Sequence, residues 1–344
     1  MPVKARFEEL DSLRGIAALW VVLFHYTGGV TAWLPGQPDL VARITPWTGN
    51  LQGLYAVHLF FMISGFVIMM TLENTAHVRD FVVSRIARLY PAFWFALAVS
   101  GGVSLVWQLP RQFVTVPQIL VNATMLQDFI GVKNVDDVYW SLTFEIGFYA
   151  LAAMTLAAGA KRHAEKLGAM WVAVALLLQI MLPALGLALP WRVQAALALP
   201  YAGLFVAGLV FYRIWLSDVT VWRVGLLALC FAQQVIFAHP LVLMMTTAFF
   251  LIFILCVSGN AAFLRHRLLL WLGGISYPLY LIHAVVGIRC QLTLQALGLP
   301  AILNLLITLL FALTLATFVS RFVEPPGRHA MRRVLSRRMG YAAS

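Results

Sequence analysis

Apolar runs of about 20 residues recur along this whole 344-residue chain, and that is the length an α-helix needs to cross a bilayer. Hydrophobic residues make up 62% of the chain and charged residues 11%, against roughly 45–50% and 25% in soluble domains. The chain is therefore predicted to be an all-α, polytopic transmembrane helical bundle of about ten spans. The predicted spans are 14–31, 51–71, 89–108, 138–158, 169–189, 195–214, 222–238, 240–258, 269–290 and 301–321.

A single integral-membrane domain is expected over residues 1–344, with spans within about 14–323, an extramembrane loop at 111–137 and a basic tail at 324–344. Ten spans put 19 of the 24 Lys and Arg residues on one side, so the positive-inside rule predicts that both termini are cytoplasmic. Topology and attraction to anionic lipid are the simplest explanation of the net charge of +11. The three cysteines lie in apolar runs, which argues against disulfides and a thiolate metal site, and no metal is expected.

The first apolar run carries two ionisable residues, Arg14 and His25. Eleven residues make three helical turns plus about 20°, so the two side chains share one helix face, roughly 16 Å apart along the axis. Ionisable groups at membrane depth cost about 2–4 kcal/mol or more and usually face a cavity with a function. The pair therefore predicts a polar path from the membrane surface toward the bilayer centre.

Two further arginines, Arg85 and Arg88, precede Pro91, which is predicted to start the third span. Their three-residue spacing places both guanidinium groups on one side of a helical turn. Arginine forks at a cytosolic surface suit phosphate groups, which they bind bidentately. The alternative is a pair of topological anchors, as found in many multispan proteins.

Among the acidic residues, Glu145 alone falls well inside a predicted span. Trp140 would mark the outer interface, with Glu145 about 8 Å deeper and Tyr149 one turn further on the same face. A buried carboxylate must be protonated or paired, and His25 and His58 are the basic candidates at similar depth. A structural hydrogen bond between two helices is the alternative interpretation.

In the ninth predicted span, Ser276, Tyr280 and His283 form a polar stripe on one helix face. Pro278 would kink this helix and free a carbonyl, which usually indicates a cavity. Interhelical hydrogen bonding explains the stripe equally well. In the second span, Ser64-Gly65 is expected to be a close-packing position.

Taken in order, these motifs resemble the acyltransferase-3 family, the integral-membrane acyltransferases of bacteria. The resemblance covers most of the chain, and the ordered set is more specific than any one motif. It rests on Leu10 to Ala17 with His25, Leu59 to Phe66, Arg85 to Pro91, Tyr139 to Leu142 with Glu145 and Phe148-Tyr149, Ile275 to His283, and Glu324-Pro325.

The resemblance implies a multi-pass protein of the bacterial inner membrane that transfers an acyl group, often acetyl, from cytosolic acyl-CoA to a hydroxyl of a carbohydrate or lipid-linked glycan. It maps the functional arginine–histidine pattern onto Arg14 and His25, and the arginine pair onto Arg85 and Arg88. The three arginines would hold the coenzyme A phosphates. His25 would act as a base or as a nucleophile, and Glu145 would orient it or stabilise its cationic form.

Under the same hypothesis, Ser276, Tyr280, His283, Tyr149 and Trp140 would contact substrate or support the site. Acyl-CoA would be a co-substrate rather than a tightly bound cofactor, and nucleic acid is not an expected partner. Two other functions remain open: a proton-coupled transporter or flippase that uses His25 and Glu145 as a relay, and a glycan-handling protein such as a polysaccharide polymerase.

Overall fold

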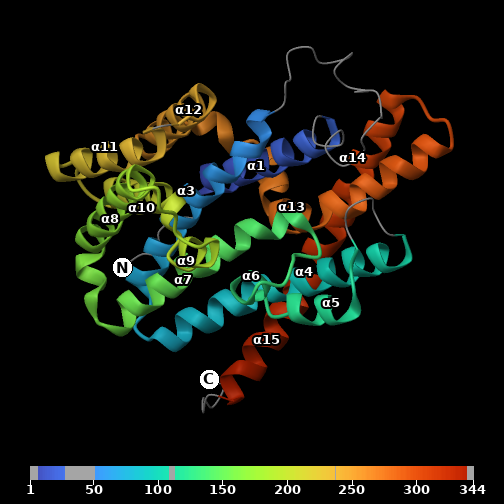
Figure 1. Cartoon of the computed structure of the whole chain (residues 1–344), viewed down its shortest axis with the longest axis horizontal. Helices are drawn as coiled ribbons and strands as arrows, with labels where there is room; N and C mark the ends of the chain where they lie inside the picture. The colour runs from blue at the N-terminus through green and yellow to red at the C-terminus, as the bar shows by residue number, and fades with distance from the viewer. Residues whose placement is uncertain (1–6, 28–50, 108–112, 237, 339–344) are drawn as a thin grey trace. The chain divides into compact units, whose positions relative to one another are not determined.

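The computed structural model describes residues 7–27, 51–107, 113–236 and 238–338 (Figure 1). Over these residues the regular elements are all helical, as the hydropathy pattern predicts. The α-helices are α1 (Glu8–Thr27), α3 (Leu51–Asn74), α4 (Val78–Val106), α5 (Val116–Asn122), α6 (Gln127–Ile130), α7 (Trp140–Ala157), α8 (Ala164–Ala184), α9 (Trp191–Ala196), α10 (Ala202–Leu216), α11 (Val221–Val235), α12 (Pro240–Val257), α13 (Arg267–Ala296), α14 (Ala301–Phe318) and α15 (Glu324–Arg338). The shorter elements are η1 (Asp137–Tyr139), η2 (Ala160–His163), η3 (Leu199–Tyr201), η4 (Ala262–Arg265) and the π-helical turn η5 (Val319–Val323).

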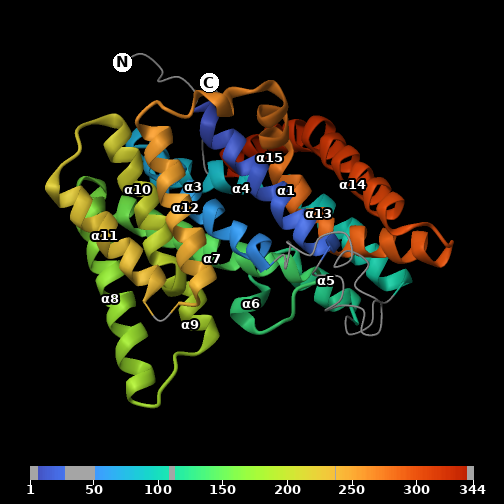
Figure 2. The same ribbon diagram turned by 90° about the horizontal axis from the view of Figure 1, so that it is seen from above.

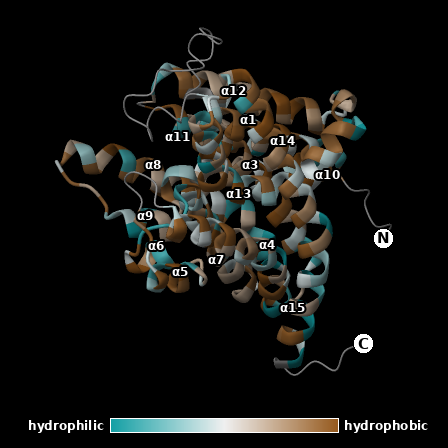
Figure 3. Cartoon of the chain, turned by 90° about the vertical axis from the view of Figure 1, so that its right-hand side faces the viewer, coloured by the Kyte–Doolittle hydropathy of each residue, from teal (hydrophilic) through white to brown (hydrophobic). Residues whose placement is uncertain are grey.

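Within the described residues, eight helices are long and apolar enough to cross a membrane, and Figure 3 shows hydrophobic residues along most of them. Each of the ten predicted spans overlaps one of the long helices, but α1 and the 15-residue α11 are not among these eight. The multi-pass class is therefore confirmed, while the count of ten and the cytoplasmic termini stay predictions. Parts of the predicted segments at 28–31, 108, 111–112, 237 and 339–344 lie outside the described residues.

The chain divides into two compact units. Unit 1 contains the described residues within 1–14, 57–81 and 141–270, and unit 2 those within 15–56, 82–140 and 271–344. The prediction of a single domain is not tested by this division and stays a prediction.

Unit 1 is a helical bundle in which α8, α10, α11 and α12 lie side by side (Figure 2). Glycines permit the closest approach, between α3 and α10: a Cβ added to Gly65 would lie 1.9 Å from the carbonyl oxygen of Phe205. One added to Gly208 would lie 1.9 Å from that of Met62. The predicted packing role of Gly65 is thereby confirmed, since small residues let membrane helices approach closely.

Unit 2 holds the C-terminal part of α1 together with α13, α14 and most of α4. The segment 113–136, expected as part of an extramembrane loop, packs against α4. Ile119 of α5 contacts Gly101, and the Trp94 indole N–H donates to the carbonyl of Ala123 at 2.9 Å. The Tyr90 hydroxyl donates to the carbonyl of Thr124 at 2.7 Å. This segment therefore folds back along α4.

Pro91 and Pro278 each lie inside a helix rather than at its end. The prediction that Pro91 starts a span is wrong, because α4 begins at Val78 and continues through it. Pro278 lies inside α13 and lacks the N–H that would bond to the carbonyl of Gly274. The Ser320 hydroxyl donates to that carbonyl at 3.0 Å. The carbonyl predicted to be freed by the proline is thus present. It accepts a hydrogen bond from a neighbouring helix's side chain and does not mark a cavity.

Candidate functional site

Helix α1 is continuous from Glu8 to Thr27, so Arg14 and His25 do lie on one helix face as their spacing predicts. Within unit 2, α1 packs directly on α13. A Cβ on Gly15 would lie 2.5 Å from the backbone nitrogen of Gly273, so the two backbones touch near their N-termini. This contact sets the register that brings the later residues of both helices together.

His25 contacts His283 of α13, with 3.1 Å between Nδ1 of His25 and Nε2 of His283. Nδ1 of His283 lies 2.7 Å from the carbonyl oxygen of Tyr280, and Nδ1 of His25 lies 2.9 Å from that of Val21. A carbonyl oxygen only accepts, so each of these Nδ1 atoms carries the proton in the neutral ring.

Two consequences follow from this arrangement. The one Nδ1–H of His25 is shared between two acceptors, the carbonyl of Val21 and Nε2 of His283, and Nε2 of His25 keeps its lone pair. His283 is fully buried, whereas His25 is half-buried. The pair therefore presents one basic nitrogen, Nε2 of His25, held by a hydrogen bond on the opposite side of the ring.

Further bonds between α1 and α13 fix this geometry. The Tyr26 hydroxyl donates to the carbonyl of His283 at 3.0 Å, and the Gln291 side chain donates to the carbonyl of Tyr26 at 3.1 Å. Gly287 leaves room for the Tyr26 ring, since a Cβ there would lie 2.0 Å from the tyrosine oxygen. Interhelical hydrogen bonds of this kind restrict the rotation of α1 about its axis.

Ser276, Tyr280 and His283, the predicted polar stripe on α13, have different hydrogen-bond partners. The Tyr280 hydroxyl donates to the carbonyl of Val138 at 2.8 Å, and the Ser276 hydroxyl donates to the carbonyl of Gly273 in its own helix at 2.8 Å. The Tyr280 bond joins α13 to another segment, as the alternative interpretation expected, whereas the Ser276 bond stays within α13. Their roles toward substrate stay predictions. His283 is the member of the stripe whose contact with His25 carries the site.

Asp136 supports the same helix, a role that the sequence analysis did not predict. Its carboxylate accepts from the backbone N–H of Val285 at 3.1 Å and from that of Val138 at 3.3 Å. The side chain is fully buried, and burial raises its pKa to about 7, because desolvation disfavours the charged form. Charge in a predicted loop is usually solvated, so pattern alone could not identify it.

Glu145 belongs to unit 1 and is half-buried. Its Oε1 atom accepts from the hydroxyls of Ser64, at 3.1 Å, and Tyr149. Trp140 is the first residue of α7, five positions before it. The glutamate therefore joins α3 to α7 in the way the structural alternative described. His25 belongs to unit 2, and the predicted action of Glu145 on it stays a prediction.

Arg85 and Arg88 lie on one turn of α4 in unit 2, both half-buried. Nε of Arg85 donates to the hydroxyl of Ser84 at 3.3 Å. Arg14 falls in unit 1, so a phosphate site shared by all three arginines stays a prediction. His58, which is buried, packs against the Tyr201 ring with centroids 5.4 Å apart.

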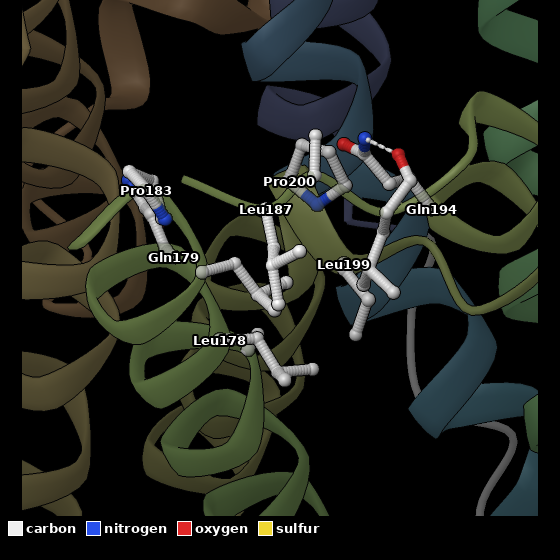
Figure 4. A pocket seen from close by; sticks show the side chains of 11 residues that line it. Leu178, Gln179, Pro183, Leu187, Gln194, Leu199 and Pro200 are labelled. Carbon is white, nitrogen blue, oxygen red and sulfur yellow. Dashed lines mark hydrogen bonds between the residues drawn. The ribbon is translucent and has the colours of Figure 1, made fainter. Parts of the chain in front are cut away.

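A cavity of about 330 Å³ lies in unit 1 between the C-terminal half of α8 and the segment that contains α9 (Figure 4). Its walls are mainly leucine and proline side chains, with Gln179 and Gln194 as polar members. The residues predicted for the site are absent from its lining.

Comparison with known proteins gives one family match and one relative. Residues 7–321 match the family model of acyltransferase-3, described as an acyltransferase domain. Nodulation protein 10 of Rhizobium leguminosarum bv. viciae is 30% identical over 139 residues, which is 35% of this chain and 37% of that protein. The matched stretch thus covers little more than a third of the relative. No solved structure matches.

Proposed function

The chain belongs to the acyltransferase-3 family, and we propose that it transfers an acyl group, acetyl in the simplest case, from cytosolic acyl-CoA to a hydroxyl of a carbohydrate or lipid-linked glycan. The observation that supports this most is the lone pair that the hydrogen bonds leave on Nε2 of His25. A neutral imidazole is a suitable general base for a hydroxyl at neutral pH. The proposed location is a bacterial inner membrane.

In the proposed reaction, Nε2 of His25 takes the proton of the acceptor hydroxyl while the oxygen attacks the thioester carbonyl. The carbon–sulfur bond then breaks, and the coenzyme A thiolate takes that proton from Nε2. The products are an ester and free coenzyme A. His283 stabilises the imidazolium, because its Nε2 accepts a hydrogen bond from the charged ring.

The binding roles follow from charge and position. Arg85 and Arg88 would bind the phosphates of the donor bidentately, and Arg14 would contribute from the first helix. In the nucleophilic version of the mechanism, Nε2 of His25 itself attacks the thioester, the carbon–sulfur bond breaks and coenzyme A leaves as the thiolate. The acyl group on Nε2 then passes to the acceptor oxygen as the carbon–nitrogen bond breaks, and the hydroxyl proton goes to the thiolate. Trapping labelled protein after incubation with acetyl-CoA alone separates the two versions.

The test uses membranes that contain the protein, labelled acetyl-CoA and cell-envelope glycan. The expected result is labelled glycan with the wild type and none with His25→Ala. The matched control is His163→Ala, which removes an exposed histidine and should retain activity. Ester formation by His25→Ala at the wild-type rate would contradict the proposal. Uptake of label into vesicles without ester would instead favour the transporter.

A further inference from the structure

The C-terminal helix α15 has an unusual distribution of charge. It contains the exposed arginines Arg328, Arg332, Arg333 and Arg337 and a single acidic residue, Glu324. It follows the π-helical turn after α14 and lies beyond residue 321, where the family match ends. Its charge is therefore a property of this chain that the family assignment does not explain.

Helix α15 is packed against α4 close to the arginine pair. A Cβ added to Gly327 would lie 2.5 Å from Cβ of Pro91, so the α15 backbone touches α4 at that point. Pro91 follows Arg88 by three residues, which is less than one helical turn of 5.4 Å. Both helices belong to unit 2 in this region. The first turn of α15 therefore contacts α4 within one turn of Arg88, and Arg85 lies one further turn along α4.

The exposed arginines of α15 are spaced for joint binding. Arg328 directly follows the contact residue Gly327, and Arg332 lies four residues further, so their side chains are neighbours on one face. Met331 and Leu335 are half-buried and continue the face of Gly327. Arg328 and Arg332 therefore lie on a different face of α15 from Gly327, Met331 and Leu335, and that face is exposed and accessible to a ligand.

We propose that Arg328 and Arg332 of α15 form, with Arg85 and Arg88 of α4, one binding site for the phosphate groups of the acyl-CoA donor. This inference rests on the proposed function. Coenzyme A carries a diphosphate and a 3′-phosphate, and planar guanidinium groups bind such oxygens in pairs. Two helices that contribute two arginines each provide cations for both phosphate positions.

Anionic phospholipid headgroups offer the same phosphate chemistry, since juxtamembrane basic clusters attract them. The packing favours the donor, because the contact at Gly327 holds the start of α15 against α4 within one turn of the half-buried Arg88. An anchor for lipid would need charge on the helix but no particular contact with α4. The two sources are therefore separable by experiment.

The test measures binding of coenzyme A to the full chain in detergent by titration calorimetry. The variant Arg328→Ala/Arg332→Ala should bind about tenfold more weakly than wild type, the loss expected for charge-assisted hydrogen bonds. It should also distinguish coenzyme A from 3′-dephospho-coenzyme A less well. The matched control Arg162→Ala/Lys166→Ala removes two exposed charges of unit 1 and should bind as wild type does.

A second variant tests the contact without changing charge. Gly327→Leu should weaken coenzyme A binding, because its side chain pushes α15 away from Pro91. Wild-type affinity in both variants would refute the role of α15 and leave the proposed function intact. The same variants are also compared in nanodiscs of phosphatidylglycerol and of phosphatidylcholine. If they lose only binding to phosphatidylglycerol and keep wild-type affinity for coenzyme A, α15 is a lipid anchor and the proposal is refuted. Failure of the wild type to bind coenzyme A would refute the donor assignment itself.

Discussion

Replacing His283 tests whether the second histidine supports the first. His283→Phe keeps an aromatic ring in the buried site but removes the Nε2 acceptor that lies 3.1 Å from Nδ1 of His25. The carbonyl of Val21, 2.9 Å from the same nitrogen, still favours the proton on Nδ1. The tautomer should therefore survive, while the stabilisation of the imidazolium is lost.

The size of the effect follows from that one bond. Hydrogen bonds to charged groups contribute about 1.5–3 kcal/mol, and about 1.36 kcal/mol corresponds to a tenfold change. The rate constant kcat should therefore fall by roughly 10- to 150-fold. The KM for the acyl-CoA donor should stay within about twofold, because a hydrogen bond that strengthens only in the transition state affects kcat.

The assay is the initial rate of ester formation from labelled acetyl-CoA, with folding checked by thermal denaturation. His283→Gln retains an acceptor oxygen and should recover part of the rate. The control is Tyr280→Phe, which removes the bond to the carbonyl of Val138 and leaves the histidine pair in place. A His283→Phe protein that is folded and has wild-type kcat would refute the reasoning, as would a change confined to KM.

Two further predictions concern stability. The pKa of Asp136 is raised from 3.8 to about 7 by burial, so between about pH 4 and 7 the folded state keeps a proton that the unfolded state releases. Wild-type stability should therefore fall as pH rises through that window, and Asp136→Asn should remove the dependence. If the melting temperature changes with pH equally in wild type and Asp136→Asn between pH 4.5 and 8, this prediction is contradicted. Gly208→Ala should destabilise unit 1 by about 1–3 kcal/mol, since its Cβ would overlap the carbonyl of Met62, and an unchanged denaturation midpoint would disprove it. The matched control is Gly225→Ala, because a Cβ at Gly225 meets no atom within 4 Å.

Hydropathy and spacing predicted the helices because both are local properties. Every predicted span overlaps a helix, and the continuity of α1 places Arg14 and His25 on one face as eleven-residue spacing requires. The helix start predicted at Pro91 was wrong, whereas the one predicted at Pro240 was confirmed. At Pro91 the membrane helix tolerates the missing N–H, so a residue that usually starts helices lies inside one.

The contacts of the site could not be predicted from local pattern. His25 and His283 are 258 residues apart in sequence, and their pairing depends on the register that Gly15 and Gly273 allow. The sequence placed His283 on a polar stripe but gave no means of choosing its partner. Asp136 was assigned to an extramembrane loop, and its burial could not be predicted because it arises only when that segment packs on α13.

The protonation state of His25 is the most direct measure of the central claim. In ¹⁵N NMR of the histidine-labelled protein near neutral pH, we expect a protonated Nδ1 and an unprotonated Nε2 on His25, with the assignment made by comparison with His25→Ala. The same spectrum should show a protonated Nδ1 on His283. A proton on Nε2 of His25 would mean that the nitrogen proposed to accept the hydroxyl proton is already occupied, and would contradict the account.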